Sequence, residues 1–472
     1  MSTVASPSSP AFKVLHNHAN SLARSGIYHP SVVPGVASAI ATPNFLIPTS
    51  RGTIQHLTPD NVQRHVKVPG VYIGLEDFLD RSASRTQLTE ASTTLRDYVS
   101  LLPQNGLPDS LIPIFLAVRR SNPVPATHAN SDTNVAMATS DGFNSLPLTE
   151  FFSIVQRLKD SATVVISPLD APTLPVSKIG GNRVKKMISR NERWSLATLK
   201  TLGAQNNVIV PVLPGLTLSY QATYLDSLIT KGEEIYGKAL DVNIGGISLH
   251  GLGSSFVEPF VEPELPSTAK NIELANLPAE LKNGLRLNLS YLTGPHDVLR
   301  AIRNGHDILI GDWITKTTDA GFAFTFEFGN HHHQADQLQD DRQKKPISID
   351  LWDADVFKVD LNSLKQDCTC YSCARHHRAY VTHLLSAKEM LAWTLLQIHN
   401  LHVANQFMER IQLSIKNGTF EEFVTSFTNH YAEGKFKANA GPRARGYQVK
   451  LAGNTTGKLN ESPFSKNFAE PQ

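Results

Sequence analysis

Short apolar segments alternate with longer amphipathic segments along most of the chain. The apolar segments are rich in Val, Ile and Leu, as buried strands are. They cover Val71–Gly74, Leu111–Val118, Thr163–Ser167, Val208–Leu213, Val242–Leu249, Leu285–Leu289 and Asp307–Ile310, with short strands broken by prolines expected between Val32 and Ile47. The intervening segments carry apolar residues at helical spacing, most clearly at 149–159, 183–202, 220–240 and 295–304.

Strands that alternate with helices form right-handed βαβ units and a parallel sheet. About eight such strands over about 300 residues favour a closed (β/α)8 TIM barrel over an open sheet. In such a barrel the functional groups lie at the carboxyl ends of the strands. This rule draws attention to Asp312, just past the last predicted strand, and to the turns at Pro214-Gly215 and Gly245-Gly246. A lone Asp at this place can equally be a loop cap.

The composition of the 472 residues is that of an ordinary globular protein, with 41% hydrophobic residues. The formal net charge is only +2, so affinity for nucleic acid has to come from local patches of charge. No apolar run approaches the ~20 residues that cross a bilayer, and we expect no integral membrane segment. Residues 1–59 lack Asp and Glu and are rich in Ser, a weak likeness to a transit peptide, but Arg is scarce there. We expect a cytoplasmic protein and leave open a peripheral association with the mitochondrial outer membrane.

All three cysteines lie in one short stretch, Cys368-Thr369-Cys370-Tyr371-Ser372-Cys373. A C-x-C-x2-C run supplies three of the four ligands of a tetrahedral zinc site, whereas disulfides need paired cysteines and usually an oxidising compartment. A reactive thiol cluster is the alternative interpretation. The segment 379–403 that follows predicts one long helix. With no further Cys the fourth ligand is expected to be a His, and spacing does not choose among His376, His377, His383, His399 and His402.

These patterns predict a division of the chain into five parts. Residues 1–10 are expected to be a disordered N-terminus, and 11–320 the barrel. Residues 321–345 are expected to form a strand followed by a mobile insert with the triplet His331-His332-His333. A zinc subdomain with C-terminal helices covers 346–434. The last part, 435–472, is rich in Gly, Asn, Lys and Pro and predicts a disordered basic tail.

The cysteine stretch and the helix after it resemble the zinc signature of the tRNA-guanine transglycosylase family, also called queuine tRNA-ribosyltransferases. The resemblance is carried by Cys368-x-Cys370-x2-Cys373, Arg378-Ala379-Tyr380 and Ile398-His399-Asn400-Leu401-His402. It implies a (β/α)8 barrel with an inserted zinc subdomain, in which His399 is the fourth ligand of a structural Zn²⁺. It also implies base exchange in tRNA, in which queuine replaces the wobble guanine of tRNAs with GUN anticodons.

The resemblance places the nucleophilic Asp of the family on Asp312. Catalytic members continue with C-V-x-P-T-R, whereas this chain has Trp313-Ile314-Thr315-Lys316-Thr317-Thr318, without the Pro and the Arg. The family's D-S-G-G-[FY]-Q loop falls on residues 139–144, so that the general-base Asp is replaced by Thr139, with Asp141 two residues away. Asp312 is thus the position of a vestigial nucleophile.

The base-recognition residues differ as well. The family's Q-G-G turn falls on Leu213-Pro214-Gly215, which loses the amide side chain and one backbone donor. A site that recognises a purine by hydrogen bonds loses discrimination when such groups are absent. The Asp of the family's F-D-E-C run falls on Leu169 or Asp170.

With these catalytic residues replaced, the chain resembles the non-catalytic subunit of a heterodimeric transglycosylase. We therefore expect no catalytic residue in this chain, a catalytic queuine tRNA-ribosyltransferase subunit as its partner, and a supporting role in tRNA binding. The alternatives are an active transglycosylase rebuilt around Asp312 and Asp141, and an unrelated zinc-stabilised barrel that binds RNA or protein. Basic residues that could contact tRNA phosphates, or simply be solvated, are Lys185, Lys186, Arg190, Arg193, Arg375 and Arg378.

Overall fold

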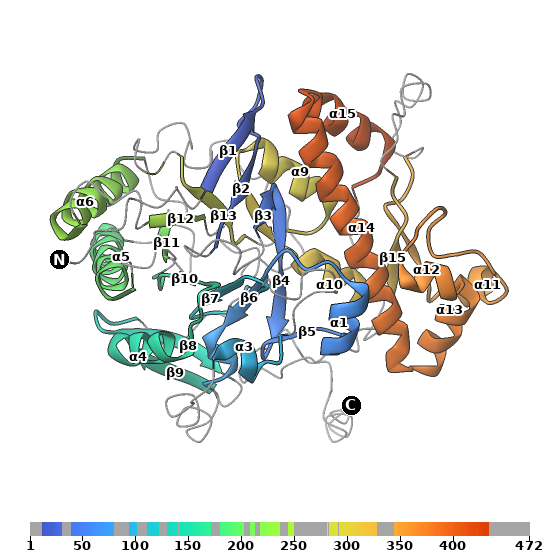
Figure 1. The fold of residues 1–472 in the computed structure, drawn as a ribbon, viewed down its shortest axis with the longest axis horizontal. Helices are drawn as coiled ribbons and strands as arrows, with labels where there is room; N and C mark the ends of the chain where they lie inside the picture. Colours follow the sequence, from blue (N-terminus) through green and yellow to red (C-terminus); the bar gives the residue numbers. More distant parts are fainter. Residues whose placement is uncertain are drawn as a thin grey trace, which may run out of the picture.

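A computed structural model describes most of the chain between residues 12 and 433 (Figure 1). The described residues are 12–30, 39–79, 94–101, 111–121, 130–139, 142–170, 180–202, 208–212, 218–236, 244–249, 281, 283–290, 292–327 and 344–433. Several predictions fall outside these ranges and concern the N-terminal residues 1–10, the His-rich insert, the tail 435–472, Asp141 and the turn 213–215.

Eight parallel strands form the centre of the molecule. They pair in the order β14, β13, β12, β11, β10, β7, β6 and β4, and β14 also pairs with β4, with Ile308 opposite Asn44. A short antiparallel strand, β5 (Thr53–Ile54), is attached to β4. The predicted α/β class with a parallel sheet is confirmed. The bounds of the strands are β4 (Asn44–Ser50), β6 (Val71–Gly74), β7 (Ile114–Ala117), β10 (Thr163–Ile166), β11 (Val208–Val212), β12 (Ile244–Leu249), β13 (Leu285–Asn288) and β14 (Ile308–Ile310).

The apolar runs of these strands bury both faces of the sheet. Successive side chains of a strand point to opposite faces, and the strand residues accordingly divide between two hydrophobic clusters. One cluster contains Tyr72, Phe115 and Ile209, and the other contains their neighbours Ile73, Leu116 and Val210 together with helical residues. Continuous Val-, Ile- and Leu-rich segments are needed because neither face meets water.

Helices follow most of the strands, as the amphipathic segments predict. Their bounds are α1 (Pro59–His65), α3 (Leu95–Tyr98), α4 (Leu148–Leu158), α5 (Gly181–Leu202), α6 (Leu218–Tyr236), α9 (Pro295–Arg303) and α10 (Asp312–Asp319), with a 3-10 turn, η1 (Leu75–Asp77), after β6. An antiparallel hairpin of β8 (Asn134–Thr139) and β9 (Gly142–Pro147) lies between β7 and α4. A separate antiparallel sheet contains β1 (Phe12–Asn17), β2 (Arg24–Tyr28) and β3 (Ile40–Thr42).

The C-terminal part begins with the strand pair β15 (Phe322–Phe324) and β16 (Ser348–Asp350). It continues with α11 (Ala354–Phe357), α12 (Tyr371–Arg375), α13 (Arg378–Ala387), α14 (Met390–Lys416) and α15 (Phe420–His430). The prediction of one helix over 379–403 is wrong, because Lys388 adopts a left-handed conformation (φ 62°) that ends α13. The backbone N–H groups of Lys388 and Glu389 bond back to Leu385 and Leu384, which closes the helix end before α14 begins.

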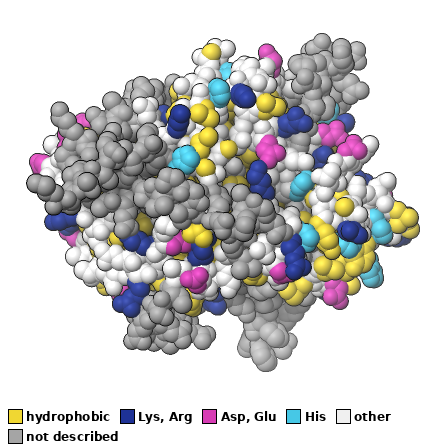
Figure 2. Space-filling view, viewed as in Figure 1, with side chains coloured by type: hydrophobic (Ala, Val, Ile, Leu, Met, Phe, Trp, Pro, Cys, Tyr) yellow, Lys and Arg dark blue, Asp and Glu magenta, His cyan; other side chains and the backbone are white. Residues whose placement is uncertain are grey.

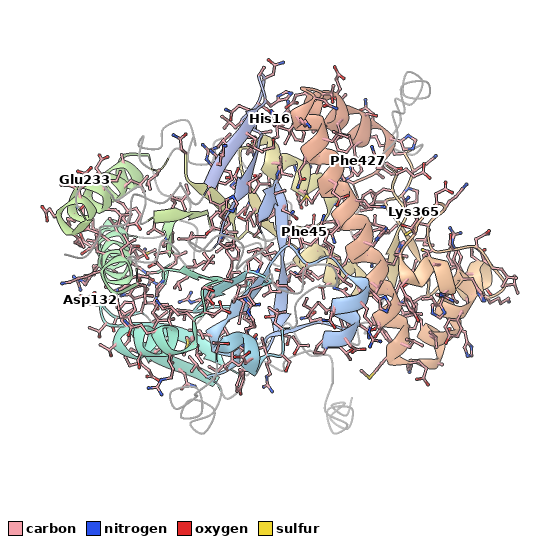
Figure 3. All side chains as sticks on the ribbon, in the orientation of Figure 1. His16, Phe45, Asp132, Glu233, Lys365 and Phe427 are labelled. Atoms are coloured by element: carbon pink, nitrogen blue, oxygen red, sulfur yellow. The ribbon has the colours of Figure 1, made fainter. Side chains whose placement is uncertain are left out.

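Helix α14 joins this C-terminal part to the rest of the molecule. It packs against α10, α12, α13 and β15 and reaches β1 and β2, and Figure 1 shows it running along one side of the sheet. An aromatic cluster supports its second half: the ring centroid of Phe326 lies 5.3 Å from that of Phe407 and 5.7 Å from that of Phe427. Figure 3 labels Phe427 beside α14. Among the described residues, no helix is both long enough and apolar enough to cross a membrane.

A buried ion pair attaches β2 to the parallel sheet. The guanidinium of Arg24 donates to both carboxylate oxygens of Asp307, at 2.8 and 2.6 Å, and Asp307 also accepts from the backbone N–H of Arg286. The side chains of Arg24 and Asp307 are 5% and 0% exposed. A carboxylate in this environment depends on its partners, because removing one partner leaves a charge without compensation.

Replacing Arg24 by Met is therefore expected to lower the free energy of unfolding by about 3–5 kcal/mol. Lys67→Met is the matched control, because Lys67 also pairs with a carboxylate, that of Glu409, but the two side chains are 64% and 55% exposed. The control should cost less than about 1 kcal/mol. Thermal unfolding of both variants tests this, and equal shifts of the midpoint would show that burial does not govern the strength of the Arg24 pair.

Candidate functional site

The structure brings together the four residues that the family resemblance names as metal ligands. The Sγ atoms of Cys368, Cys370 and Cys373 and a ring nitrogen of His399 lie within 4.8 Å of one another. The first cysteines precede α12, and the Cys370 sulfur caps this helix by accepting from the N–H of Cys373. His399 is fully buried in the middle of α14.

The distances in this cluster fit a tetrahedral metal centre. The Nδ1 atom of His399 lies 3.6, 3.6 and 3.4 Å from the sulfurs of Cys368, Cys370 and Cys373. Zn–S bonds of about 2.3 Å and a Zn–N bond of about 2.0 Å at tetrahedral angles place S and N about 3.6 Å apart. One imidazole nitrogen has a single lone pair and cannot accept a hydrogen bond from three thiols. Three similar approaches to one ring nitrogen are the arrangement that a shared metal ion would require.

Groups around the cluster hold the ligands in the orientation that a metal needs. The Nε2–H of His399 donates to the carbonyl oxygen of Phe324 at 2.8 Å, which leaves the Nδ1 lone pair free to face the sulfurs. The neighbouring Asn400 accepts from the N–H of Phe324 and donates to the carbonyl of Phe322, so it aligns β15 with α14. Ser372 donates to the carbonyl of Leu395 and fixes α12 on the same helix.

The other four candidate histidines lie outside the cluster. His376 stacks on the ring of Tyr380, with centroids 5.2 Å apart. The Nδ1 of His377 caps α13 by accepting from the N–H of Tyr380. His383 is exposed, and His402 is half-buried one turn beyond His399. The structure thus separates the five histidines, which spacing alone does not.

Asp312 lies at the carboxyl end of β14, where it begins α10. Its Oδ1 accepts a hydrogen bond from the hydroxyl of Ser121 at 3.1 Å, and burial raises the pKa of the Asp312 carboxyl. The residues after Asp312 face α14 instead of the strand ends. Trp313 is fully buried, and Thr315 and Thr318 accept from the side-chain amides of Gln397 and Asn400.

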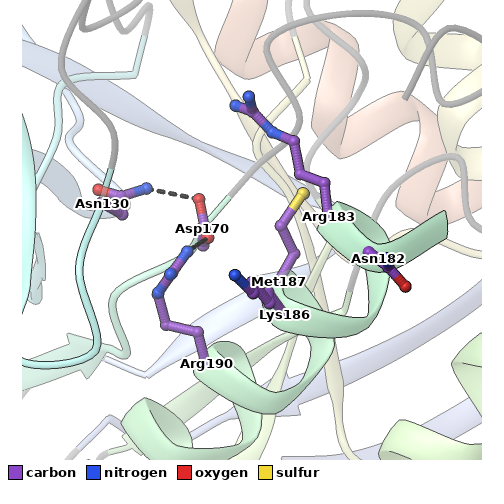
Figure 4. Close-up of a pocket in the computed structure, with 7 residues that line it drawn as sticks. All are labelled: Asn130, Asp170, Asn182, Arg183, Lys186, Met187 and Arg190. Atoms are coloured by element: carbon purple, nitrogen blue, oxygen red, sulfur yellow. Dashed lines mark hydrogen bonds and ion pairs between the residues drawn. The ribbon is translucent and has the colours of Figure 1, made fainter. Parts of the chain in front are cut away.

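The other positions that correspond to catalytic groups carry either no acid or an acid that already has partners. Thr139 ends β8, is 1% exposed and accepts from the side chain of Asn144. Asp170 follows β10, and its two oxygens already have partners: Asn130 donates to one at 2.5 Å, and Arg190 pairs with the other (Figure 4). Leu169 packs against the hydrophobic core.

A cluster of acidic and basic side chains lies after β6 and β7, and its members are not among the site residues predicted from the sequence. Glu76 is 1% exposed, and its Oε1 accepts from the backbone N–H of Arg120 at 2.7 Å. The Arg120 side chain also approaches Asp77 at 2.9 Å. Burial raises the pKa of Glu76 to about 7. A signal for these residues was present in the sequence, because Arg119-Arg120 directly follows one predicted strand and Glu76-Asp77 begins two residues after another.

Replacing Glu76 by Gln is expected to reduce the pH dependence of stability. Because the pKa of Glu76 is raised from 4.5 to about 7 by folding, the folded state retains a proton that the unfolded state releases between these values. The stabilising contribution is present below pH 4.5 and is lost as the pH rises through about 7. Relative to the native chain, the Gln variant should therefore gain on the order of 2–3 kcal/mol between about pH 5 and pH 8.

Thermal unfolding at the two pH values measures this gain. Glu409→Gln serves as the control, because the Glu409 side chain is 55% exposed. A difference between native and Glu76→Gln midpoints that is the same at both pH values would contradict the raised pKa.

The basic residues proposed for tRNA differ in how they are engaged. Arg378 bonds to Asp360 and to backbone carbonyls, and thus holds the loop before α12. Arg190 pairs with Asp170, and Arg193 with Asp132. Lys185 and Lys186 are exposed on α5. Among the described residues, no carboxylate forms an ion pair with either lysine.

Comparison with known proteins adds an independent line of evidence. The family model described as Queuine tRNA-ribosyltransferase matches residues 22–433. The queuine tRNA-ribosyltransferase accessory subunit 2 of Schizosaccharomyces pombe is 35% identical over 416 residues, which cover 87% of this chain and 83% of the relative. The accessory subunit 2 of Xenopus laevis is 25% identical over 413 residues, or 80% of this chain and 90% of the relative. A queuine tRNA-ribosyltransferase of Moorella thermoacetica is 41% identical over 80 residues, 17% of this chain and 21% of that protein.

Proposed function

The chain belongs to the queuine tRNA-ribosyltransferase family, and from this premise we propose that it is the non-catalytic subunit of a heterodimeric enzyme that exchanges guanine for queuine in tRNA. Relatives that match most of the chain carry the name accessory subunit 2. Their name implies a catalytic partner, which we propose is a queuine tRNA-ribosyltransferase subunit. In this assembly the chain completes the dimer and supports tRNA binding.

The observation that carries this proposal is the environment of Asp312. A nucleophilic carboxylate has to face the substrate, with a second group that transfers protons. Here the carboxyl accepts a hydrogen bond from the hydroxyl of Ser121, and Thr139 replaces the acid of the catalytic loop. The segment after Asp312 instead packs on α14. A single carboxyl without these supporting groups favours the interpretation that this subunit does not catalyse base exchange.

We propose that the Cys368, Cys370, Cys373 and His399 group holds one Zn²⁺ in a structural role. Thiolates and an imidazole suit zinc, and four protein ligands leave no coordination position for water. The parallel sheet, with β14 paired to β4, supports the (β/α)8 barrel over 11–320, and the zinc subdomain over 346–434 is proposed as its attachment. Three thiols in one metal cluster support a reducing, cytoplasmic location.

The zinc subdomain also presents apolar side chains to solvent, and we propose that the catalytic subunit covers them. Figure 2 shows hydrophobic side chains gathered on the side of the molecule formed by α11, α12 and α13. Exposed apolar patches mark interaction surfaces on soluble proteins. The residues concerned and their exposed fractions are Val356 (57%), Val359 (76%), Leu361 (74%), Tyr371 (41%), Met390 (69%) and Leu391 (42%).

Reconstitution with the catalytic homologue from the same source tests the proposed function. We expect the chain alone to incorporate no labelled guanine or queuine into tRNA above background. Mixed with the catalytic subunit it should elute as a heterodimer that incorporates the base. Base exchange by the lone chain at the rate of the mixture, or separate elution of the two chains, would refute the proposal.

A further inference from the structure

We propose that the cavity beside Asp170 binds a phosphate group. The cavity has a volume of about 290 Å³ and is open at the carboxyl end of β10. Ligands of parallel α/β folds bind at this end of the strands. Its polar lining comes from the loops before β8 and after β10 and from the first turns of α5, and consists of Asn130, Asp170, Asn182, Arg183, Lys186 and Arg190 (Figure 4).

The lining residues of α5 concentrate positive charge on one side of the helix. Arg183, Lys186 and Arg190 are three and then four positions apart, a spacing that places them on the same helical face. Arg190 is neutralised by Asp170 and approaches Asp132. Among the described residues no carboxylate pairs with Arg183 or Lys186, which are both exposed at the cavity. Like charges one turn apart repel each other, and a bound anion removes that repulsion.

The carboxylate in the cavity is not available as the main recognition group. Asp170 is only 6% exposed, and each of its oxygens already accepts from Asn130 or Arg190. A base whose N–H groups seek an acceptor would have to compete with these partners. A phosphate instead finds donors in the guanidinium of Arg183, the ammonium of Lys186 and the NH2 group of the Asn182 amide. The cavity therefore suits an anion better than a neutral base.

Two sources can supply such a group: a phosphodiester of RNA, or the phosphate of a free nucleotide. The RNA source rests on the proposed function, whereas the nucleotide source does not. Both share the chemistry of a tetrahedral anion, and a cavity of about 290 Å³ is near the lower limit of ligand sites. It accommodates a phosphate with little of the molecule that carries it.

The test compares the full-length double variant Arg183→Gln, Lys186→Gln with the control Arg157→Gln, Lys200→Gln. Both lose one Arg and one Lys from exposed helical positions, but Arg157 and Lys200 do not line the cavity. Calorimetric titration measures binding of inorganic phosphate, guanosine 5′-monophosphate and guanosine. A second assay measures tRNA binding by the assembled complex as a function of salt.

Binding of phosphate and of the monophosphate that falls by about tenfold or more only in the double variant would establish a nucleotide site. If neither small probe binds, a slope of log K against log salt that decreases by about one only in the double variant would establish the RNA source. Equal behaviour of the two variants in both assays, or guanosine binding as tight as that of its monophosphate, would overturn the proposal. Co-elution with the catalytic subunit, scored for both variants, separates this result from a failure of the proposed function.

Discussion

Replacing Cys370 by Ser is expected to remove most of the bound zinc and to unfold the C-terminal part around β15, α12 and the first half of α14. Metal content should fall from about one equivalent to a small fraction, because three remaining ligands bind zinc far more weakly than four. Zinc binding to such sites contributes folding free energy directly. We expect the thermal midpoint to fall by roughly 10 °C or more, since a loss of several kcal/mol shifts a domain of this size by a few degrees per kcal/mol.

The position of Cys370 makes this variant more damaging than the loss of one ligand suggests. Cys370 is 4% exposed, and its sulfur also caps α12 by accepting from the N–H of Cys373. Without the metal, His399 is a fully buried imidazole whose Nδ1 faces three sulfurs. The metal then no longer supports His399, whose Nε2–H holds the carbonyl of Phe324 in β15. The unfolding should therefore spread to the contact between α10 and α14.

His402→Gln is the matched control for this prediction. His402 belongs to the same Ile398–His402 run, but the structure places it outside the cluster. It should keep about one equivalent of zinc, whereas His399→Gln should lose it. Metal analysis after gel filtration and thermal unfolding decide between them. A full equivalent of zinc in Cys370→Ser or His399→Gln would show that the four residues are not the ligand set.

Local features of the fold followed from the sequence because they depend on neighbouring residues. Runs such as Val71–Gly74, in which both faces are apolar, predict the strands. The close spacing of the three cysteines predicts a metal site. The fourth member of the cluster, His399, lies 26 residues beyond Cys373 on another helix. Only the family resemblance singled it out. The break at Lys388 was missed because apolar periodicity continues across it while a single left-handed residue ends the helix.

Features that depend on distant pairs could not be predicted. Asp307 is separated from Arg24 by 283 positions, and Asp312 from Ser121 by 191. A pattern of apolar and polar residues contains no information about which polar side chains meet. The same limit applies to Glu76, whose raised pKa arises from burial, and to the cation-lined cavity, which needs α5 placed against the loop after β10. The residues at these sites are visible in the sequence, but their partners are not.

Asp312→Asn is expected to leave base exchange by the heterodimer unchanged, within about twofold. A variant of a true nucleophile would lose on the order of 10⁴-fold or more in rate, because an amide cannot form the covalent intermediate. The substitution preserves the shape of the side chain, and the amide oxygen can still accept from the hydroxyl of Ser121. Because burial raises the pKa of the Asp312 carboxyl, the neutral amide should be at least as stable at neutral pH as the native residue.

The corresponding variant of the catalytic subunit is the positive control for this experiment. Changing the corresponding Asp of the catalytic subunit to Asn should abolish incorporation of labelled guanine, whether or not this chain carries its own substitution. The rate of the doubly native heterodimer fixes the scale, and thermal unfolding shows that each variant is folded. If Asp312→Asn alone abolished incorporation, the carboxyl would be chemically active despite its hydrogen bond to Ser121 and its lack of a second acid at Thr139. An unchanged rate means that the retained Asp312 serves the packing and hydrogen bonding at the start of α10, as its contacts indicate.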